Sequence, residues 1–344
     1  IRNERVLMDK IGVGMVGCGV MGTALAASCN KLERAHILAV SDVRQDIADK
    51  AAAELNARAF TDYHDMLALS DIDAVLVAVP GFLHRAPAVS AAQAGKHVFC
   101  EKPMAVSLED CDAIMVACDT ADRKLMIGQV CRCHGVHGRV KQLVLDGHIG
   151  QPTCMVVRRL GGGWSGEWVQ HWRMERAKSG GTLMEVNAHE IDFMRWVCGD
   201  VKSVSARGAQ YIDSQTDFED IMLLNLEFVN GAIGHHQSSN ASAIGEYGGR
   251  LDGTEGSIHF PAIWGERAGI HYGRFGEKPQ FIPAADIVVE EPVIAELRAF
   301  VDAIIHNTTP PVTGHDGRAV VEIALAAYQS VQAGESGALP MGKV

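Results

Sequence analysis

Gly17-Cys18-Gly19-Val20-Met21-Gly22 stands between an apolar run, Ile11 to Val16, and a helix-forming stretch that begins at Thr23. The apolar run has the length and composition of a buried strand. A second apolar run, His36 to Val40, leads to Asp42, about 20 residues past Gly22. Strand, glycine turn, helix, strand and acid, in this order, are typical of a dinucleotide-binding unit.

Each glycine of this turn has its own predicted role. Gly17 permits the tight turn off the strand, Gly19 lets the backbone approach a pyrophosphate, and Gly22 lets the helix pack closely on the sheet. The backbone N–H groups at Val20 and Met21 then face the phosphates at the positive end of the helix. A competing register, Gly12 to Gly17, is rejected because the residues before it, Arg5 to Lys10, are mostly polar.

The residues after the second strand indicate which dinucleotide is bound. Asp42 can accept hydrogen bonds from the adenosine ribose, and its charge repels a 2′-phosphate, so the pattern favours NAD over NADP. Val43 and Arg44 follow it and are included in the predicted cofactor site. Arg44 can tolerate a phosphate, which weakens the preference.

Composition excludes several classes of function. The chain has 344 residues, enough for two domains, and a formal net charge of −11 without a compensating basic block, which argues against a nucleic-acid partner. It lacks an apolar run long enough to cross a membrane. The nine cysteines are expected to be unpaired thiols in a reducing cytoplasm. Cys131-Arg132-Cys133 is too closely spaced for a zinc half-site, so no metal is expected.

Apolar runs and helical stretches alternate up to about Val130, which predicts an α/β Rossmann domain with a doubly wound parallel sheet. In such sheets ligands bind beyond the carboxyl ends of the strands, where Pro80 and Glu101 also lie. We expect this NAD-binding domain to span residues 1–130.

The pattern changes after Val130 to long alternating runs, which predict a C-terminal α+β domain with a large, open-faced, mainly antiparallel sheet. A single helix near Thr182 to Cys198 interrupts the expected strands: Thr153 to Arg159, Val201 to Tyr211, Ile221 to Phe228, Ala232 to Ser239 and Gly256 to Phe260. The second domain is expected to span residues 131–344 and to serve substrate binding and oligomerisation. Its helices from about 293 to 332 are expected to pack back toward the first domain.

Three further segments point to one family: Val79-Pro80-Gly81-Phe82-Leu83-His84, Ala94-Gly95-Lys96-His97-Val98-Phe99-Cys100-Glu101-Lys102-Pro103, and Gly180-Gly181-Thr182-Leu183-Met184-Glu185-Val186-Asn187-Ala188-His189-Glu190-Ile191-Asp192. Together with the glycine turn they resemble the Gfo/Idh/MocA oxidoreductases, the group of glucose–fructose oxidoreductase and inositol dehydrogenase. The resemblance covers nearly the whole chain in order.

The resemblance implies hydride exchange between a nicotinamide cofactor and a secondary alcohol of a sugar or cyclic polyol. It places Lys102 near substrate and nicotinamide, and it implies a cis bond before Pro103. The aspartate and histidine of the family's Asp-x-x-x-His motif map onto Glu185 and His189. This chain departs from the family at Glu185, whose carboxylate lies one methylene further from the backbone, and that leaves its role open.

The residues themselves support this chemistry. Glu185 and His189 are four positions apart, so on one helix they project from the same face. His189 titrates near neutral pH and can accept the hydroxyl proton, a contribution of roughly 10²–10⁴-fold in rate. Lys102 can stabilise the developing alkoxide. The alternative is a solvated polar stripe on a helix surface, which spacing alone does not exclude.

Other residues are weaker candidates. Trp164, Trp172 and Arg173 belong to a tryptophan-rich segment that can stack on a sugar ring and hold an anionic group, or can equally pack on the core or a partner subunit. Arg132 and Asn187 are candidate substrate ligands, although Asn187 can instead simply assist the helix turn around the site. His84 is a candidate cofactor contact. Both His84 and Arg132 can instead be structural.

We expect an NAD-dependent dehydrogenase for a secondary hydroxyl of a sugar, glycoside or cyclic polyol. One alternative is a glycosidase that uses bound NAD in a transient cycle of oxidation, elimination and reduction. A non-catalytic dinucleotide or sugar sensor is a further alternative, disfavoured because Lys102 and His189 are both present. A homo-oligomer, dimer or tetramer, is expected through the open sheet.

Overall fold

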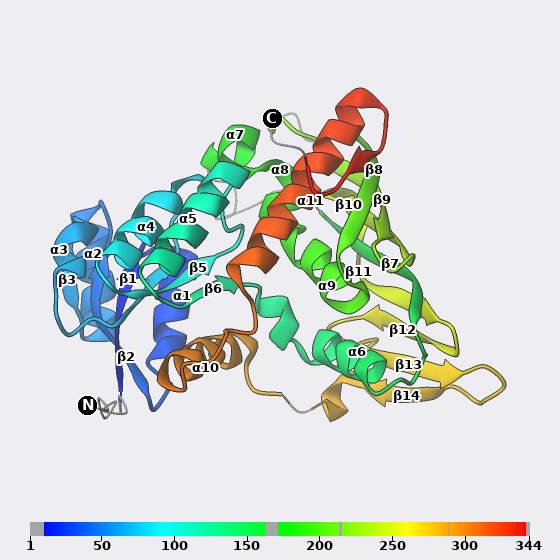
Figure 1. Cartoon of the computed structure of the whole chain (residues 1–344), viewed down its shortest axis with the longest axis horizontal. Helices are drawn as coiled ribbons and strands as arrows, with labels where there is room; N and C mark the ends of the chain where they lie inside the picture. Colours follow the sequence, from blue (N-terminus) through cyan, green and yellow to red (C-terminus); the bar gives the residue numbers. More distant parts are fainter. Residues whose placement is uncertain (1–9, 163–170, 213–214, 288, 342–344) are drawn as a thin grey trace. The chain divides into compact units, whose positions relative to one another are not determined.

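The computed structural model describes residues 10–162, 171–212, 215–287 and 289–341 (Figure 1). The tryptophan-rich prediction at Trp164 lies outside them. The chain divides into two compact units. Unit 1 is Ile1–Gln129 with Glu290–Arg318, and unit 2 is Val130–Val289 with Ala319–Val344.

Unit 1 alternates strands and helices, as predicted. Its strands are β1 (Ile11–Val16), β2 (Ala35–Ser41), β3 (Arg58–Phe60), β4 (Ala74–Val77), β5 (His97–Glu101) and β6 (Leu125–Gly128). Its helices are α1 (Val20–Cys29), α2 (Gln45–Leu55), α3 (Tyr63–Leu67), the short 3₁₀ turn η1 (Gly81–Leu83), α4 (Arg85–Gln93), α5 (Leu108–Thr120) and α10 (Pro292–Ile305); α11 (Gly314–Ala333) begins here.

The six strands form one parallel sheet in the order β3-β2-β1-β4-β5-β6. Every residue of β1 and β4 is buried, because helices cover both faces of the sheet. α1 contacts α10, while α4 and α5 lie side by side, as Figure 1 shows. The Rossmann prediction is confirmed, and the carboxyl ends of β1 and β2 bring Gly17 and Asp42 to one edge.

Unit 2 contains a mixed sheet and a small group of helices. Its strands are β7 (Pro152–Gly162), β8 (Val201–Ala209), β9 (Ile221–Phe228), β10 (Ile233–Ser239), β11 (Ala241–Gly253), β12 (Gly256–Ala262), β13 (Gly269–Arg274), β14 (Gln280–Pro283) and β15 (Gly337–Ala338). Its helices are η2 (Val130–Cys133), α6 (Gly135–Leu145), η4 (His171–Met174), α7 (Arg176–Ser179), α8 (Gly181–Glu185), α9 (Ala188–Cys198), η5 (Ala284–Asp286) and the rest of α11.

The nine strands are ordered β14-β13-β12-β11-β7-β10-β9-β8-β15. All neighbours are antiparallel except β7 and β10, so the predicted mainly antiparallel sheet is confirmed. α9 packs on β7 and β10 at one face. On β9, buried Leu224 and Leu226 alternate with exposed Leu223 and Asn225, as expected for a sheet with one covered and one open face.

The prediction of one helix from Thr182 to Cys198 is wrong. α8 ends at Glu185 and α9 starts at Ala188, with Asn187 as the N-cap residue of α9. Glu185 and His189 therefore do not project from the same face of one helix. The break has a packing cause: the Asn187 side chain is fully buried and bonds to Glu190 and Ser238, so it holds the start of α9 to β10.

A buried histidine lies in the core of unit 2. His137 on α6 is fully buried, its ring centroid 4.3 Å from that of Phe193, and neither ring nitrogen has a hydrogen-bond partner among the described residues. Burial, with smaller contributions from His134 and Arg159, lowers the pKa of His137 to about 3. Its ring is thus neutral in the folded protein at any moderately acidic pH.

This histidine predicts a specific acid sensitivity. In the unfolded chain the ring binds a proton below about pH 6.5, so stability is lost as pH falls from there toward 3, by about 2 kcal/mol at pH 5. His137→Phe should flatten this part of the pH profile, measured by urea unfolding between pH 5 and 8. His306→Phe, at an exposed position, is the control. A profile for His137→Phe parallel to that of the wild type would contradict the assignment.

No helix in the described part of the chain is both long and apolar enough to span a bilayer.

Candidate active site

The glycine turn has the geometry that a dinucleotide requires. Gly17 has φ +94°, and a Cβ there would lie 2.7 Å from the carbonyl oxygen of Ala78. A Cβ on Gly22 would lie 1.9 Å from the carbonyl oxygen of Gly17, so only glycine allows α1 to start this close to β1. A Cβ on Gly19, by contrast, would meet no atom of the described residues within 4 Å. The protein leaves that space open, as the approach of a pyrophosphate requires.

Asp42 is held in place by backbone N–H groups. Its carboxylate accepts one from Cys18 and one from Arg44, each at 3.0 Å, so it bridges the ends of β1 and β2. The Arg44 guanidinium turns away to Asp46, at 2.6 Å. This ion pair is exposed, with the Arg44 and Asp46 side chains 64% and 69% accessible.

Three apolar side chains near the turn are exposed, and the cysteine within the turn is unreactive. Val20, Met21 and Val43 are 57%, 38% and 90% exposed, unusual for such side chains and suited to contact with a bound ring system. Burial, and then the charge of Asp42, raise the pKa of the Cys18 thiol to about 12. Cys18 is thus a neutral thiol and not a nucleophile.

Lys102 sits in a tightly held turn after β5. The Glu101 carboxylate is 9% exposed and accepts the backbone N–H of Lys102 at 2.9 Å. The Lys102–Pro103 peptide bond is cis, as the resemblance implied. A Cβ on Gly81, in the loop that Pro80 opens, would lie 3.1 Å from the Pro103 ring, so this loop and the turn are in close contact.

His84 is buried between two loops. Its side chain is 1% exposed, and its ring nitrogens face the carbonyl oxygens of Val79, Pro103 and Met104. The ring thus links two loops, the structural role that the sequence left open, and the predicted contact of His84 with a cofactor stays a prediction.

In unit 2, Glu185 forms a buried ion pair. Its carboxylate accepts from Nε of Arg173 at 2.7 Å, and the two side chains are 8% and 15% exposed. The Arg173 guanidinium also lies 4.5 Å from the centroid of the Trp172 ring. The longer glutamate side chain thus pairs with Arg173, which the sequence had nominated independently as a substrate ligand.

α8, which carries Glu185, is fixed by two glycines and a tyrosine. Gly180 and Gly181 have φ +76° and +72°, in the left-handed region. A Cβ on Gly181 would lie 2.6 Å from the Tyr328 hydroxyl oxygen, which accepts the backbone N–H of Leu183 at 2.8 Å. The glycine pair thus serves to seat the helix on α11.

His189 is the second residue of α9 and is half-buried. Its position in the first turn matters electrostatically, because the positive end of a helix disfavours a cationic ring.

Arg132 and Asn187 are both bonded to side chains of unit 2. Arg132 donates from Nε and Nη2 to Asp192 at 2.7 and 2.6 Å, an almost fully buried bidentate pair. Asn187 is fully buried. Its amide nitrogen donates to the Glu190 carboxylate, and its amide oxygen accepts from the Ser238 hydroxyl. These contacts support α9, and the substrate-binding role of Arg132 and Asn187 stays a prediction.

Sequence reasoning overlooked Glu190, next to His189. It is fully buried, accepts from Asn187, and lies 3.7 Å from the Arg159 guanidinium. Arg159 in turn lies 4.3 Å from the centroid of Tyr247. The available signal was a glutamate on the apolar side of α9, which a helical-wheel reading would have marked as a buried charge that needs a partner.

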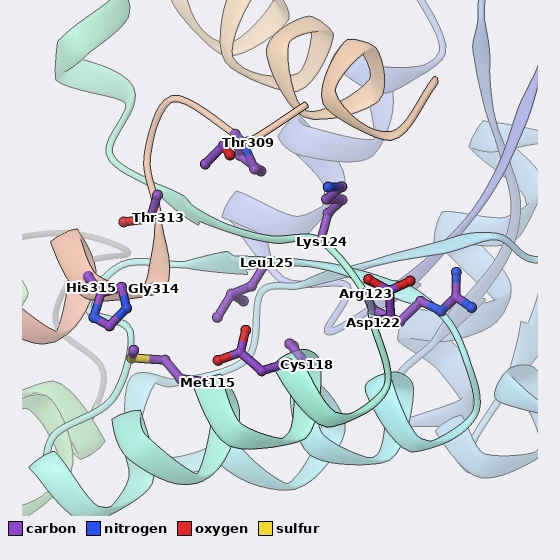
Figure 2. Close-up of a pocket in the computed structure, with 12 residues that line it drawn as sticks. Met115, Cys118, Asp122, Arg123, Lys124, Leu125, Thr309, Thr313, Gly314 and His315 are labelled. Atoms are coloured by element: carbon purple, nitrogen blue, oxygen red, sulfur yellow. The ribbon is translucent and has the colours of Figure 1, made fainter. Parts of the chain in front are cut away.

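A separate pocket of about 320 Å³ lies in unit 1 (Figure 2). It is lined by the end of α5, by Asp122 to Leu125, and by the residues around the start of α11. Leu125 begins β6, so the pocket is at the amino edge of the parallel sheet, opposite Gly17 and Asp42. Its charges are of both signs, from Asp119, Asp122, Arg123 and Lys124, and we assign it no role.

The described residues contain no group of three or more His, Cys, Asp or Glu side chains that could hold a metal ion.

Comparison with known families agrees with this geometry. Residues 11–129 match an oxidoreductase family with an NAD-binding Rossmann fold, and residues 137–259 match the GFO/IDH/MocA C-terminal domain. The chain belongs to the GFO/IDH/MocA oxidoreductase family.

Individual members of the family differ in activity. The chain is 31% identical over 258 residues to the 2,7-anhydro-N-acetylneuraminate hydratase of Mediterraneibacter gnavus, covering 73% of this chain and 67% of that protein. It is 27% identical over 337 residues to the myo-inositol 2-dehydrogenase of Thermotoga maritima, covering 93% and 96%. The aldose-aldose oxidoreductase of Caulobacter crescentus superposes with a TM-score of 0.86 at 26% identity, covering 96% and 100%.

The glycine turn makes a paired prediction. Gly22→Ala should lower the melting temperature, because its methyl group meets the Gly17 carbonyl oxygen. Gly19→Ala should keep the wild-type melting temperature and weaken NAD⁺ binding at least tenfold, because its methyl group enters space that only a ligand uses. Thermal unfolding and calorimetric titration with NAD⁺ measure the two effects. Wild-type NAD⁺ affinity in Gly19→Ala would contradict the assignment.

Proposed function

We propose that this family member oxidises a secondary hydroxyl of a sugar, glycoside or cyclic polyol with NAD⁺. The proposal rests chiefly on one observation, the open space at Gly19 beside an Asp42 carboxylate held by two backbone N–H groups. The relatives named above, among them an inositol dehydrogenase, support the substrate class.

The proposed cofactor is NAD⁺ and not NADP⁺. A 2′-phosphate would meet the negative charge of Asp42, and the nearby cation, Arg44, is paired with Asp46. Val20, Met21 and Val43 offer apolar contact to the adenosine half. Pro80 and the turn with Glu101 and Lys102 follow the neighbouring strands at the same edge of the sheet.

The reaction assigns one task to each polar residue. Bound nicotinamide supplies the acceptor for the hydride that leaves the carbinol carbon. The His189 ring takes the proton that leaves the hydroxyl oxygen as the hydride leaves the carbon. The Lys102 ammonium stabilises the negative charge that develops on the carbinol oxygen.

Glu185 and Arg173 are proposed to bind neighbouring hydroxyl groups of the substrate as a unit. A carboxylate accepts and a guanidinium donates, so together they can satisfy a vicinal diol, while Trp172 offers a face for the ring. Because the two charges offset each other, the pair suits a polyhydroxylated region of the substrate.

A second candidate is a redox-neutral reaction in which bound NAD is reduced and then reoxidised within one turnover. The similarity to a protein named as a hydratase favours it, because hydration involves no net oxidation. The same residues would carry out this reaction. The two candidate functions differ in whether NADH accumulates.

The experiment is a screen of purified protein with NAD⁺ against free sugars, inositols, anhydrosugars and glycosides, followed by NADH absorbance and by chromatography of the sugars. A rise in NADH with one compound supports the dehydrogenase. Consumption of a compound without NADH supports the redox-neutral candidate. Intact compounds and no NADH throughout the panel would contradict both.

His189→Asn should lower kcat by roughly 10²–10⁴-fold on whichever compound is turned over, with NAD⁺ affinity unchanged, because the ring is the proton acceptor. His235→Asn is the matched control, since His235 lies on β10 and is bonded to Asn225. Equal turnover by the two variants would remove His189 from the mechanism.

A further inference from the structure

His84 is the most tightly enclosed histidine near the Lys102 turn. It follows η1 directly, precedes α4, and is 1% exposed. Its partners come from two segments that are distant in sequence: Val79 lies beyond the end of β4, and Pro103 and Met104 lie beyond the end of β5. The ring thus connects the ends of two neighbouring strands.

Both ring nitrogens face carbonyl oxygens. Nε2 lies 2.8 Å from the oxygen of Val79, and Nδ1 lies 2.9 Å from that of Pro103 and 3.3 Å from that of Met104. A carbonyl oxygen can only accept a hydrogen bond, so each nitrogen must donate to make a favourable contact. A neutral imidazole carries one N–H and one lone pair, and its lone pair would face an oxygen lone pair at hydrogen-bond distance.

We propose that His84 is a positioning residue, protonated on both ring nitrogens, that ties the loop after β4 to the turn carrying Lys102. The inference rests on the proposed function, in which Lys102 stabilises the alkoxide. It assigns His84 no contact with substrate or cofactor.

The packing around the turn explains why one ring can position Lys102. The Lys102 backbone N–H is held by Glu101 on one side, and the Pro103 carbonyl is held by His84 on the other. Pro103 also packs on Gly81, in the loop that the second nitrogen of His84 secures. Loss of the bond to Pro103 should loosen the turn that carries Lys102. Loss of the bond to Val79 should loosen only the loop after β4 and leave that turn attached to His84.

Two amide variants separate these bonds. In His84→Asn the side-chain amide nitrogen can take the place of Nδ1 and donate to Pro103, whereas in His84→Gln it can replace Nε2 and donate to Val79. Both variants lose one hydrogen bond, and Asn, one methylene shorter than Gln, also leaves part of the buried space unfilled, so the melting temperature of each variant is measured first. Hydrogen exchange should quicken at residues 101–106 in His84→Gln and at residues 79–83 in His84→Asn.

The effect on catalysis is tested by comparing kcat of the two variants on the compound found in the screen. We expect kcat of His84→Gln to fall at least tenfold below that of His84→Asn, with KM for NAD⁺ changed less than threefold in both. Equal kcat values in two folded variants, or faster exchange at the same residues in both, would overturn the positioning role.

The protonation state is tested without turnover. In ¹⁵N-histidine-labelled protein at pH 7, with the His84 signals assigned by their loss in His84→Asn, both ring nitrogens should carry a directly bonded proton. A nitrogen without one would overturn the inference of a doubly protonated ring. Lys102→Ala separates the two proposals: retained turnover there would refute the alkoxide-stabilising role of Lys102, while the ring signals would still report the protonation of His84.

Discussion

The close approach of Gly22 to the carbonyl oxygen of Gly17 is the constraint on which the cofactor half of this protein depends. A single added carbon would lie 1.9 Å from that oxygen. Because the approach is possible, α1 starts directly beyond β1 and its first N–H groups face the carboxyl edge of the sheet. Asp42 arrives at the same edge from β2, and its bond to the Cys18 N–H joins the two strand ends.

In unit 2 the organising interactions are buried ion pairs around α9. Arg173–Glu185 and Arg132–Asp192 are each at 2.6 to 2.7 Å and nearly excluded from water. Loss of one partner would leave a buried charge uncompensated, a cost of several kcal/mol, so each pair holds its segments in place. The pairs anchor Glu185 at the end of α8 and Asp192 within α9, while Asn187 holds the start of α9, where His189 lies in the first turn.

Much of the architecture could be predicted from local patterns. The apolar runs before Gly17 and Asp42 are buried strands because a parallel sheet is covered on both faces. β11 was missed because Gly245, Gly248 and Gly249 disfavour a strand in isolation. In the fold, a Cβ on Gly249 would lie 2.4 Å from the Val156 carbonyl oxygen, so its glycine serves close packing against β7.

The sequence could predict the residue types of the candidate site, but it could not predict which side chains bond to one another. Spacing placed Glu185 and His189 on one helix, but the break depends on Asn187 reaching Ser238, 51 residues away. Arg132 meets Asp192 across 60 residues, and His84 meets Pro103 across 19. Each of these partners is brought in by the tertiary fold, so the sequence alone could nominate the side chains and not say what they bind.

The central claim, that this edge of the sheet is built for NAD, is tested most directly by calorimetric titration of NAD⁺ and NADP⁺ into the wild-type protein and Asp42→Ala. The account predicts that NAD⁺ binds at least tenfold more tightly than NADP⁺ and that Asp42→Ala narrows the difference, because the carboxylate both accepts from the ribose and repels the 2′-phosphate. Tighter binding of NADP⁺ to the wild type, or a preference unchanged by Asp42→Ala, would contradict it.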